Sequence, residues 1–303
     1  MKNNKFTVTI GIPAFNEEAN IHRLLTSILL QRRDNFILER IIVMSDGSTD
    51  LTVSEAKKTK NNLITVIDKK QRQGLNESQN QIIKLASSDV LIIFNSDILI
   101  KNHNAIENMV SHFYKFKNLG IVGARTDIIW PKSFIGRILA NSHFIKQTIF
   151  QKYKKGDNVY LCHGSARAFA KAFYKKLTWP YNCPEDAYSY FACKKNNYKF
   201  IYEKNSIIHF SPSSNFSDHY KQSTRFFNGK KIIEKYFNKN DIRSEYKLPL
   251  FLTLSCLLAF IFKKPHLTIP FIFLLPIMII LSQVRKVDHS KYEISASTKN
   301  LTQ

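Results

Sequence analysis

The first part of the chain alternates between short apolar runs and segments in which apolar residues recur at helical spacing. Strands are predicted over residues 6–12, 39–45, 63–68, 90–94 and 120–124, and helices over residues 19–32, 49–60, 75–86 and 106–116. Strand and helix in turn, with short links, predict an α/β fold with a mostly parallel sheet and helices on both faces. Ligands bind such sheets at the carboxyl ends of the strands.

The pattern changes twice farther along the chain. From about residue 126 the alternation is lost, and we expect these aromatic and basic segments to pack against the same sheet. Residues 248–262 and 267–284 are then almost entirely apolar, and the second run is close to the roughly 20 residues that a spanning helix needs. This pair predicts attachment to a membrane.

Two membrane geometries are compatible with this apolar pair. It can form a transmembrane hairpin with both ends in the cytoplasm, interrupted in its second run by Pro270 and Pro276, or two helices lying in the cytoplasmic leaflet. Lys263 and Lys264 in the connecting turn favour a turn that stays inside, because basic loops tend not to be translocated. The polar tail from Asp288 onward is predicted to be disordered.

Composition narrows the partners. Lys and Arg outnumber Asp and Glu by 45 to 23, a formal charge of +22, which suggests phosphorylated ligands, a membrane surface or nucleic acid. No nucleic-acid-binding module is present in the sequence, so we expect no such partner. The four cysteines form no CxxC pair, which argues against zinc, and no GxGxxG motif supports a nicotinamide or flavin cofactor. The short N-terminal apolar run is not typical of a signal peptide, so we expect the domain on the cytoplasmic side of the cell membrane.

Polar clusters follow three of the predicted strands: Pro13 to Glu18, Asp46 to Asp50, and Asn95 to Asp97. Each cluster alone is compatible with a turn or a helix cap. The carboxyl ends of neighbouring parallel strands meet in one crevice, however, so we expect the three clusters to converge. The sequence therefore predicts a polar binding site at this edge of the sheet.

A nucleoside diphosphate with a divalent cation suits these residue types. Asp46 can accept a hydrogen bond from a base, and Asn16, Glu17 or Asn95 can reach ribose hydroxyls. Asp97 can coordinate Mg²⁺ or Mn²⁺, which take oxygen ligands and share them with phosphate. Two further features suit the pyrophosphate, namely Arg72 and the amino-terminal end of the helix after Gly74.

The order of these motifs resembles the inverting family-two glycosyltransferases, which have the GT-A fold. PAFNEE, DGSTD, Gly74 with Asn80, and NSD match the nucleotide-binding half. Downstream, HGSA around Gly164 is similar to the family's acceptor-side segment, Pro184-Glu185-Asp186 to its ED motif, and QSTRF from Gln222 to its QxxRW signature. The chain departs from the usual residues at Asn95, Phe226 and Gln79. The resemblance covers roughly residues 5 to 230.

The resemblance implies transfer of a sugar from a nucleotide-diphosphate sugar to a hydroxyl with inversion, in the synthesis of cell-surface polysaccharide or lipid-linked glycan. It implies Asp186 as catalytic base and Asp97 as ligand of Mg²⁺ or Mn²⁺. Its implied nucleotide-binding residues are Pro13, Ala14, Asn16, Glu17, Asp46, Arg72, Gly74, Asn80, Asn95 and Ser96. Its implied acceptor or phosphate residues are Gly164, Glu185, Gln222 and Arg225.

Alternatives remain for several of these assignments. The acceptor can instead be polyprenyl phosphate, or the protein can be a non-catalytic nucleotide- or glycan-binding module at a membrane. His163 and His209 are compatible with ligand contacts or with buried structural roles. The expected organisation is a glycosyltransferase domain over residues 1–245, with a nucleotide-binding half (1–125) and an acceptor half (126–245), then membrane helices over 246–286 and a tail over 287–303.

Overall fold

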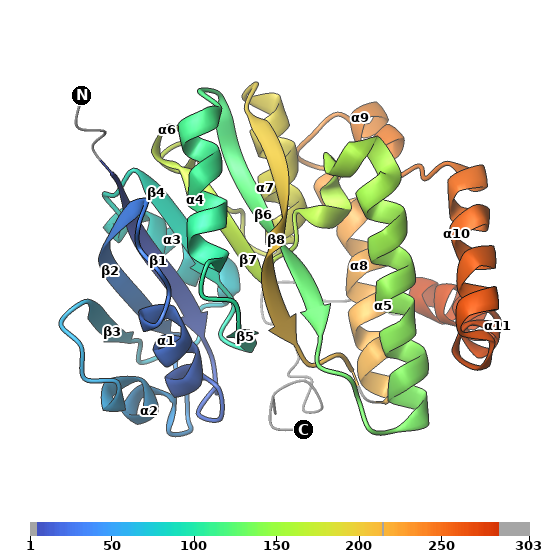
Figure 1. The fold of residues 1–303 in the computed structure, drawn as a ribbon, viewed down its shortest axis with the longest axis horizontal. Helices are drawn as coiled ribbons and strands as arrows, with labels where there is room; N and C mark the ends of the chain where they lie inside the picture. Colours follow the sequence, from blue (N-terminus) through green and yellow to red (C-terminus); the bar gives the residue numbers. More distant parts are fainter. Residues whose placement is uncertain (1–4, 214, 285–303) are drawn as a thin grey trace.

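The computed structural model describes residues 5–213 and 215–284, which fold around a single sheet with strand order β3-β2-β1-β4-β7-β6-β8-β5 (Figure 1). The strands are β1 (Phe6–Ala14), β2 (Phe36–Ser45), β3 (Ile64–Asp68), β4 (Val90–Phe94), β5 (Ile98–Ile100), β6 (Leu119–Ile128), β7 (Ala166–Ala170) and β8 (Lys199–Phe210). The predicted alternation of strand and helix is confirmed as far as β6.

Helices cover both faces of this sheet, as predicted. They are α1 (Ile21–Leu29), α2 (Thr52–Lys58), α3 (Leu75–Leu85), α4 (Ala105–Lys115), α5 (Phe134–Lys152), α6 (Lys171–Tyr174), α7 (Glu185–Lys195), α8 (Phe216–Ile233), α9 (Lys239–Glu245), α10 (Leu250–Lys263) and α11 (Pro265–Val284), with short 3-10 turns at Tyr153–Gly156 and Val159–Leu161. The buried sides of α1 and α4 form one core with the sheet, and those of α3 and α7 form the other. Alternate strand residues therefore point into different cores.

The sheet is mixed, because β7 inserts antiparallel between β4 and β6 and β5 pairs antiparallel with β8. The remaining pairs, β1 with β2 and β4, β2 with β3, and β6 with β8, are parallel. The local sequence pattern predicted the strand at β6 but not its neighbour β7. Whether a strand runs parallel or antiparallel depends on the path of the connection before it, here the long helix α5.

The sheet is also strongly curled. Only residues 95–97 join β4 to β5, and the four chain steps from Phe94 to Ile98 span at most about 14 Å. Four strand spacings separate β4 from β5 in the sheet order, which would amount to about 19 Å in a flat sheet. The curl closes this difference. It places Asn95 to Asp97 beside the carboxyl end of β8, where Ile98 lies opposite Phe210.

The two predicted apolar segments form α10 and α11, which lie at the edge of the molecule farthest from β1–β3 (Figure 1). Side chains of α5, α10 and α11 share a small apolar core that includes Ile145, Cys256 and Phe271. Within it, Asn141 of α5 donates a hydrogen bond of 3.1 Å to Thr268 of α11, and both side chains are fully buried. The helix α11 is continuous through both prolines.

The outer sides of these two helices are exposed and apolar. On α10, Phe251 and Phe262 are each 86% exposed, and the apolar stripe between them continues at a spacing of three or four residues through Leu254 and Leu258. A second exposed stripe on α11 consists of Ile269, Phe273, Ile277 and Ile280. A helix on the surface of a soluble domain normally presents polar residues there.

By length and composition alone, one helical stretch of the described chain, Lys239–Lys263, is suited to crossing a membrane, and 11% of its most apolar window is buried inside the protein. This stretch contains both α9 and α10. The 14 residues of α10 are about 21 Å long, which is shorter than the roughly 30 Å of a bilayer core. Arg285 and Lys286, whose positive charges favour a cytoplasmic C-terminus, and the predicted tail lie outside the described residues.

Candidate active site

The loops after β1 and β2 are joined by reciprocal hydrogen bonds. Asn16 adopts a left-handed backbone conformation with φ of 53°, and its side-chain oxygen accepts a bond of 2.8 Å from the Thr49 amide. The backbone amide of Asn16 donates to Ser48 Oγ at 3.1 Å, and the backbone amide of the buried Glu17 donates to Thr52 Oγ1 at 2.7 Å. The predicted convergence of the first two polar clusters is therefore present.

Asp46 lies at the end of β2 and organises the surrounding loops through hydrogen bonds. Its backbone amide continues the hydrogen bonding between β1 and β2, since it donates to the carbonyl of Ala14, the neighbour of Pro13, at 2.8 Å. Its Oδ1 accepts bonds from Lys69 Nζ (3.0 Å) and the Gln73 amide (2.9 Å), and its Oδ2 accepts from the Gly74 amide (2.7 Å).

The Asp46 side chain is only 4% exposed. A carboxylate offers about four lone-pair sites, so these three donors leave it capacity for one more partner. The contact with a base expected for Asp46 stays a prediction, whereas its role in anchoring the loop before α3 is a finding.

Arg72 lies on this loop, against the first polar cluster. Its guanidinium centre is 4.0 Å from the centre of the Phe15 ring. The backbone of Arg72 also lies close to Gly47. Glycine is required at position 47, because φ is +71° there and an added Cβ would lie 2.7 Å from the Arg72 amide nitrogen. Gly74 also has a positive φ, 99°, as it begins α3. Asn16, Arg72 and Gly74 therefore lie on loops that pack against one another at the ends of β1 and β2.

The third cluster connects these loops to the other half of the chain. Asn95 donates its amide hydrogen to the carbonyl of Ser165 at 3.0 Å. Ser96 is buried, while Asp97 is partly exposed between β4 and β5. The loop predicted to hold a metal therefore lies beside the segment that contains Gly164.

Gly164 in turn contacts the first turn of α7. A Cβ added to Gly164 would lie 2.6 Å from Glu185 Oε1 and 4.0 Å from the Cβ of Asp186. Side chains larger than hydrogen are excluded here unless Glu185 moves. Together with the Asn95–Ser165 bond, this packing brings the predicted catalytic base next to the predicted metal loop, although residues 97 and 186 are far apart in sequence.

The carboxyl group of Asp186 is suited to exchanging a proton near neutral pH. Burial, followed by the negative charge of Glu185, raises the pKa of Asp186 to about 7, and the positive charge of Arg167 acts in the opposite direction. Its Oδ1 accepts a bond of 2.6 Å from the Ala187 amide. A pKa matched to the working pH is the property that a general base requires.

Arg167 is a buried residue beside the candidate base, and the sequence pattern assigned no role to it. It is completely buried in β7, and its Nη1 donates to the Glu185 carbonyl at 3.0 Å and to Ser189 Oγ at 2.9 Å. Trp179 Nε1 donates to the same two oxygens at 2.9 Å each. Two buried donors thereby fix the turn of α7 that carries Asp186. An arginine inside the otherwise small and apolar strand sequence ARAFA was the available signal.

Asparagine side chains on α3 hold the segment that precedes α7. The Asn80 amide group donates to the Trp179 carbonyl and accepts from the Trp179 amide, both at 2.9 Å. Asn76 donates to the carbonyls of Pro180 (2.7 Å) and Cys183 (2.8 Å). Asn80 was expected to contact the nucleotide. In the structure it joins the two halves of the site, and a nucleotide contact by Asn80 stays a prediction.

The helix α8, which carries Gln222 and Arg225, packs an aromatic ring against Tyr160 and Tyr246. Gln222 and Arg225 precede Phe226, whose ring centroid is 6.1 Å from those of Tyr160 and Tyr246. Burial raises the pKa of Tyr246, and the negative charge of Asp186 adds to this rise. Direct contacts of Gln222 and Arg225 with a substrate remain predictions.

The two histidines singled out in the sequence, His163 and His209, lie next to Ser165 and opposite Leu99. His163 Nδ1 lies 2.9 Å from Ser165 Oγ, and burial together with the charges of His143 and Arg167 lowers its pKa to about 4. His163 is therefore neutral at physiological pH. His209 lies opposite Leu99 in the β5–β8 pair, as expected near a strand end, and burial lowers its pKa as well.

A divalent cation would have few protein ligands here. Among the described residues, no group of three or more His, Cys, Asp and Glu side chains is arranged to hold a metal ion. Asp97 supplies one carboxylate next to Asn95. Mg²⁺ is commonly bound by one or two carboxylates plus substrate phosphates and water. The donor set therefore fits an ion that enters with a diphosphate.

Comparison with known proteins agrees with this geometry. A sequence profile of the family described as "Glycosyl transferase family 2" matches residues 9–178, more than half of the 303-residue chain. The chain is 28% identical over 132 residues to poly-beta-1,6-N-acetyl-D-glucosamine synthase of Staphylococcus aureus, covering 43% of this chain and 31% of that protein. It is 30% identical over 135 residues to 4,4'-diaponeurosporenoate glycosyltransferase of the same species, covering 44% and 35%. It thus spans about a third of the length of these curated relatives.

Solved structures share the fold at low sequence identity. The mannosyltransferase PcManGT from Pyrobaculum calidifontis, in complex with GDP-Man and Mn²⁺, superposes with a TM-score of 0.65 at 16% identity, covering 93% of this chain and 87% of that one. Residues 1–349 of S. aureus TarS superpose with a TM-score of 0.56 at 15% identity, covering 78% and 68%. These likenesses show the GT-A fold.

Proposed function

Since this chain belongs to glycosyl transferase family 2, we propose that it transfers a sugar from a nucleotide-diphosphate sugar to a hydroxyl acceptor with inversion at the anomeric carbon. The observation that supports this most directly is the position of Asp186. It is a carboxyl group with a pKa near 7 beside Gly164, and Ser165, the neighbour of Gly164, accepts a hydrogen bond from Asn95.

In this proposal, different residues carry out the two tasks of the reaction. Asp186 accepts the proton of the acceptor hydroxyl as its oxygen attacks the anomeric carbon from the side opposite the nucleotide. The bond from that carbon to the diphosphate oxygen breaks, and the nucleoside diphosphate leaves with the bonding electrons. We assign the stabilisation of the diphosphate to Arg72, which lies over the Phe15 ring, and to the amino-terminal end of α3. A divalent ion held by Asp97 and the diphosphate would supply further charge stabilisation when bound.

We further infer that α10 and α11 lie in one leaflet of a membrane, with the catalytic domain on the cytoplasmic side. Both helices expose an apolar stripe to the outside, while α11 is fixed to α5 by the buried pair Asn141 and Thr268. A helix held against the domain on one side and apolar on the other suits an interface better than a bilayer span. The acceptor class that fits is a cell-surface polysaccharide or a lipid-linked glycan; the name of one S. aureus relative, poly-beta-1,6-N-acetyl-D-glucosamine synthase, supports a polysaccharide product.

Two steps test this function. The donor is identified first, and sugar transfer is then compared between wild type and variants. Nucleotide sugars screened with Mn²⁺ by thermal unfolding identify the donor, because a bound ligand raises the unfolding temperature. Transfer of that sugar to a lipid extract is then measured for wild type, Asp186→Asn and the control Asp34→Asn, which changes an exposed carboxylate paired with Arg32. We expect Asp186→Asn to lose transfer by about a hundredfold or more with donor binding retained. Near-normal transfer by Asp186→Asn would contradict the assignment.

A further inference from the structure

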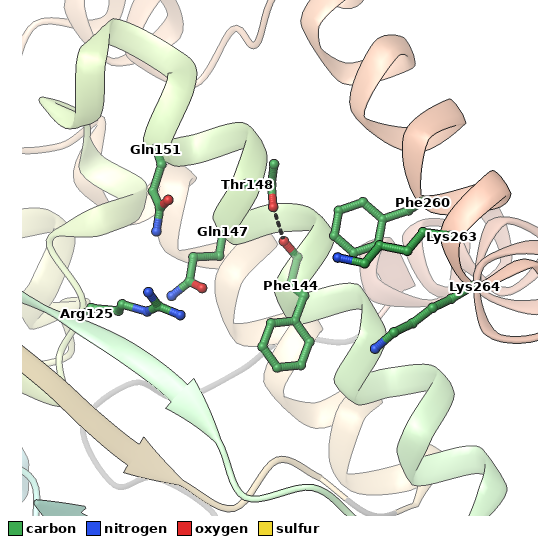
Figure 2. Close-up of a pocket in the computed structure, with 8 residues that line it drawn as sticks. All are labelled: Arg125, Phe144, Gln147, Thr148, Gln151, Phe260, Lys263 and Lys264. Atoms are coloured by element: carbon green, nitrogen blue, oxygen red, sulfur yellow. Dashed lines mark hydrogen bonds between the residues drawn. The ribbon is translucent and has the colours of Figure 1, made fainter. Parts of the chain in front are cut away.

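A groove of about 350 Å³ runs along the outer side of α5, between the end of β6 and the turn that joins α10 to α11 (Figure 2). Three cations line it: Arg125 from β6, and Lys263 and Lys264 from the end of α10. Polar side chains of α5 form its floor, and the rings of Phe144 and Phe260 line its outer side. Of the described residues that line it, none is acidic.

Two of the three cations, Lys263 and Lys264, retain positive charge toward the groove. Arg125 is paired with Asp127 at 3.1 Å, which offsets one charge. Lys264 Nζ lies 4.8 Å from the centre of the Trp130 ring and 5.8 Å from that of Phe144, contacts that orient an ammonium group without neutralising it. Figure 2 shows both lysine side chains extending from α10 toward α5. An anion therefore meets two lysine charges that no acidic residue of the described groove lining offsets.

The position of the groove indicates where this anion comes from. Lys263 directly follows Phe262, the 86% exposed end of the apolar stripe on α10, and Phe260 belongs both to this helix and to the groove. Lysines at such a boundary place their ammonium groups at the level of lipid phosphates while their carbon chains lie along apolar surface. The residues expected to bind the nucleotide line a different part of the sheet, and none of them lines this groove.

We propose that this groove binds the phosphate headgroup of an anionic membrane lipid, whose hydrocarbon chains lie along the exposed stripe of α10. The proposal rests on the membrane attachment inferred above and adds a defined site to it. In this arrangement Lys263 and Lys264 bind the phosphate oxygens, and Phe260 and Phe144 contact the glycerol and the first methylene groups. The lipid thereby fixes the height and orientation of the catalytic domain on the membrane.

Three variants test the groove as a site. Lys263→Gln with Lys264→Gln removes two charges from it, and Lys57→Gln with Lys58→Gln removes two charges from α2 on the far side of the sheet. Thr148→Phe fills the groove without changing charge, since Thr148 is a partly buried residue on its floor. Donor binding and thermal unfolding of each variant show that the domain is folded.

Binding is measured by flotation with phosphatidylcholine vesicles, with and without phosphatidylglycerol. We expect the Lys263/Lys264 variant to lose affinity for the anionic vesicles by at least about tenfold. Thr148→Phe is expected to lose affinity as well, and the Lys57/Lys58 variant to bind like wild type. Equal losses in both lysine pairs, or wild-type binding by Thr148→Phe, would overturn the proposal in favour of unspecific charge attraction.

Two further experiments are needed. One distinguishes a lipid phosphate from a free phosphate ester, and the other tests the membrane attachment on which the proposal rests. Glycerol 1-phosphate in solution should not protect the groove from lysine acetylation when anionic vesicles do; equal protection would show that a free phosphate ester, and not a lipid, is the ligand. Neutral vesicles test membrane attachment alone. If the protein binds neither neutral nor anionic vesicles, the inferred membrane attachment is wrong. Equal binding to neutral and anionic vesicles contradicts only the headgroup site.

Discussion

The Nη2 atom of Arg167 lies 3.8 Å from Oε1 of Glu185, one residue before the proposed base. The same guanidinium donates to the Glu185 backbone carbonyl, and it is fully buried under the first turn of α7. Arg167 therefore acts on Asp186 in two ways. It fixes the backbone that carries the carboxyl group, and its charge opposes the rise in the pKa of that group.

Replacing Arg167 by Met should alter both properties. Without the positive charge, the pKa of Asp186 rises further, so the acid limb of the rate–pH profile should move to higher pH. The free energy of unfolding should also fall by about 2 kcal/mol, because two buried acceptors lose a charged donor. Rate–pH profiles and urea unfolding test this, with the exposed Arg32→Gln as control. A loss of stability without a shift of the acid limb would reduce Arg167 to a purely structural residue.

Asp186→Asn should stabilise the protein at alkaline pH. In the folded protein the pKa of Asp186 is about 7, above the unfolded value of about 3.9, so the folded state binds the proton more tightly. Wild type therefore loses stability as pH rises between these two values, whereas the amide side chain of the variant does not titrate. We expect the variant to be more stable by about 2–4 kcal/mol at pH 8 and equally stable at pH 4. Chemical unfolding at both pH values measures this, and a difference independent of pH would contradict the raised pKa.

Asp46→Asn should loosen the loops around the end of β2. Asp46 accepts bonds from two backbone amides and from Lys69, and an amide cannot satisfy all three donors. We expect a loss of about 2 kcal/mol in the free energy of unfolding and weaker donor binding. Asp68→Asn is the matched control at the end of the adjacent strand β3, where the exposed carboxylate accepts a bond from Ser45 Oγ. Similar losses in both variants would show that position 46 is not special.

Metal binding should depend on the nucleotide. The described residues offer Asp97 without a cluster of further acidic, histidine or cysteine ligands, so Mn²⁺ alone should bind weakly. With a nucleoside diphosphate present, phosphate oxygens complete the shell. We expect calorimetry to detect Mn²⁺ binding only with nucleotide, Asp97→Ala to abolish it, and a chelator to abolish transfer. Tight Mn²⁺ binding without nucleotide would point to ligands beyond Asp97.

The exposed stripe on α10 should carry the attachment to neutral membranes. Replacing Phe251 and Phe262 by Ser removes two large side chains that are each 86% exposed, so folding should be little affected. Binding to phosphatidylcholine vesicles should fall by at least about a hundredfold, since burying each of the two rings contributes roughly 1.5–3 kcal/mol. Flotation measures this, with Leu51→Ser, an exposed residue beside α2, as control. Unchanged binding would leave the stripe for a protein partner.

Local sequence patterns were sufficient for most elements from β1 to β6, because each shows its own period and its own turn residues. They were not sufficient for β5, which has only three residues, or for the antiparallel insertion of β7. Both depend on pairings between distant segments. The pattern also correctly separated α10 from α11, since the basic turn at Lys263 and Lys264 divides two apolar runs.

The candidate site was predictable where a motif and a strand end coincide, as at Asp46, or where a motif begins a helix, as at Asp186. It was not predictable where the partner is remote. The reciprocal bonds of Asn80 with Trp179 join residues 99 positions apart. Arg167 is similarly inconspicuous, because one charged residue in a buried strand acquires meaning only from Glu185 and Ser189.

The curl of the sheet bears on how such proteins can diversify. The strand β6, Leu119–Ile128, pairs with β7 and β8 and spans residue 125, where the sequence suggested a division into two halves. A recombination event at that position would cut a central strand, and the loop from Asn95 to Asp97 would lose the partner strand β8. Donor and acceptor preferences in this chain should therefore evolve by point substitution around a preserved sheet and not by exchange of halves between relatives.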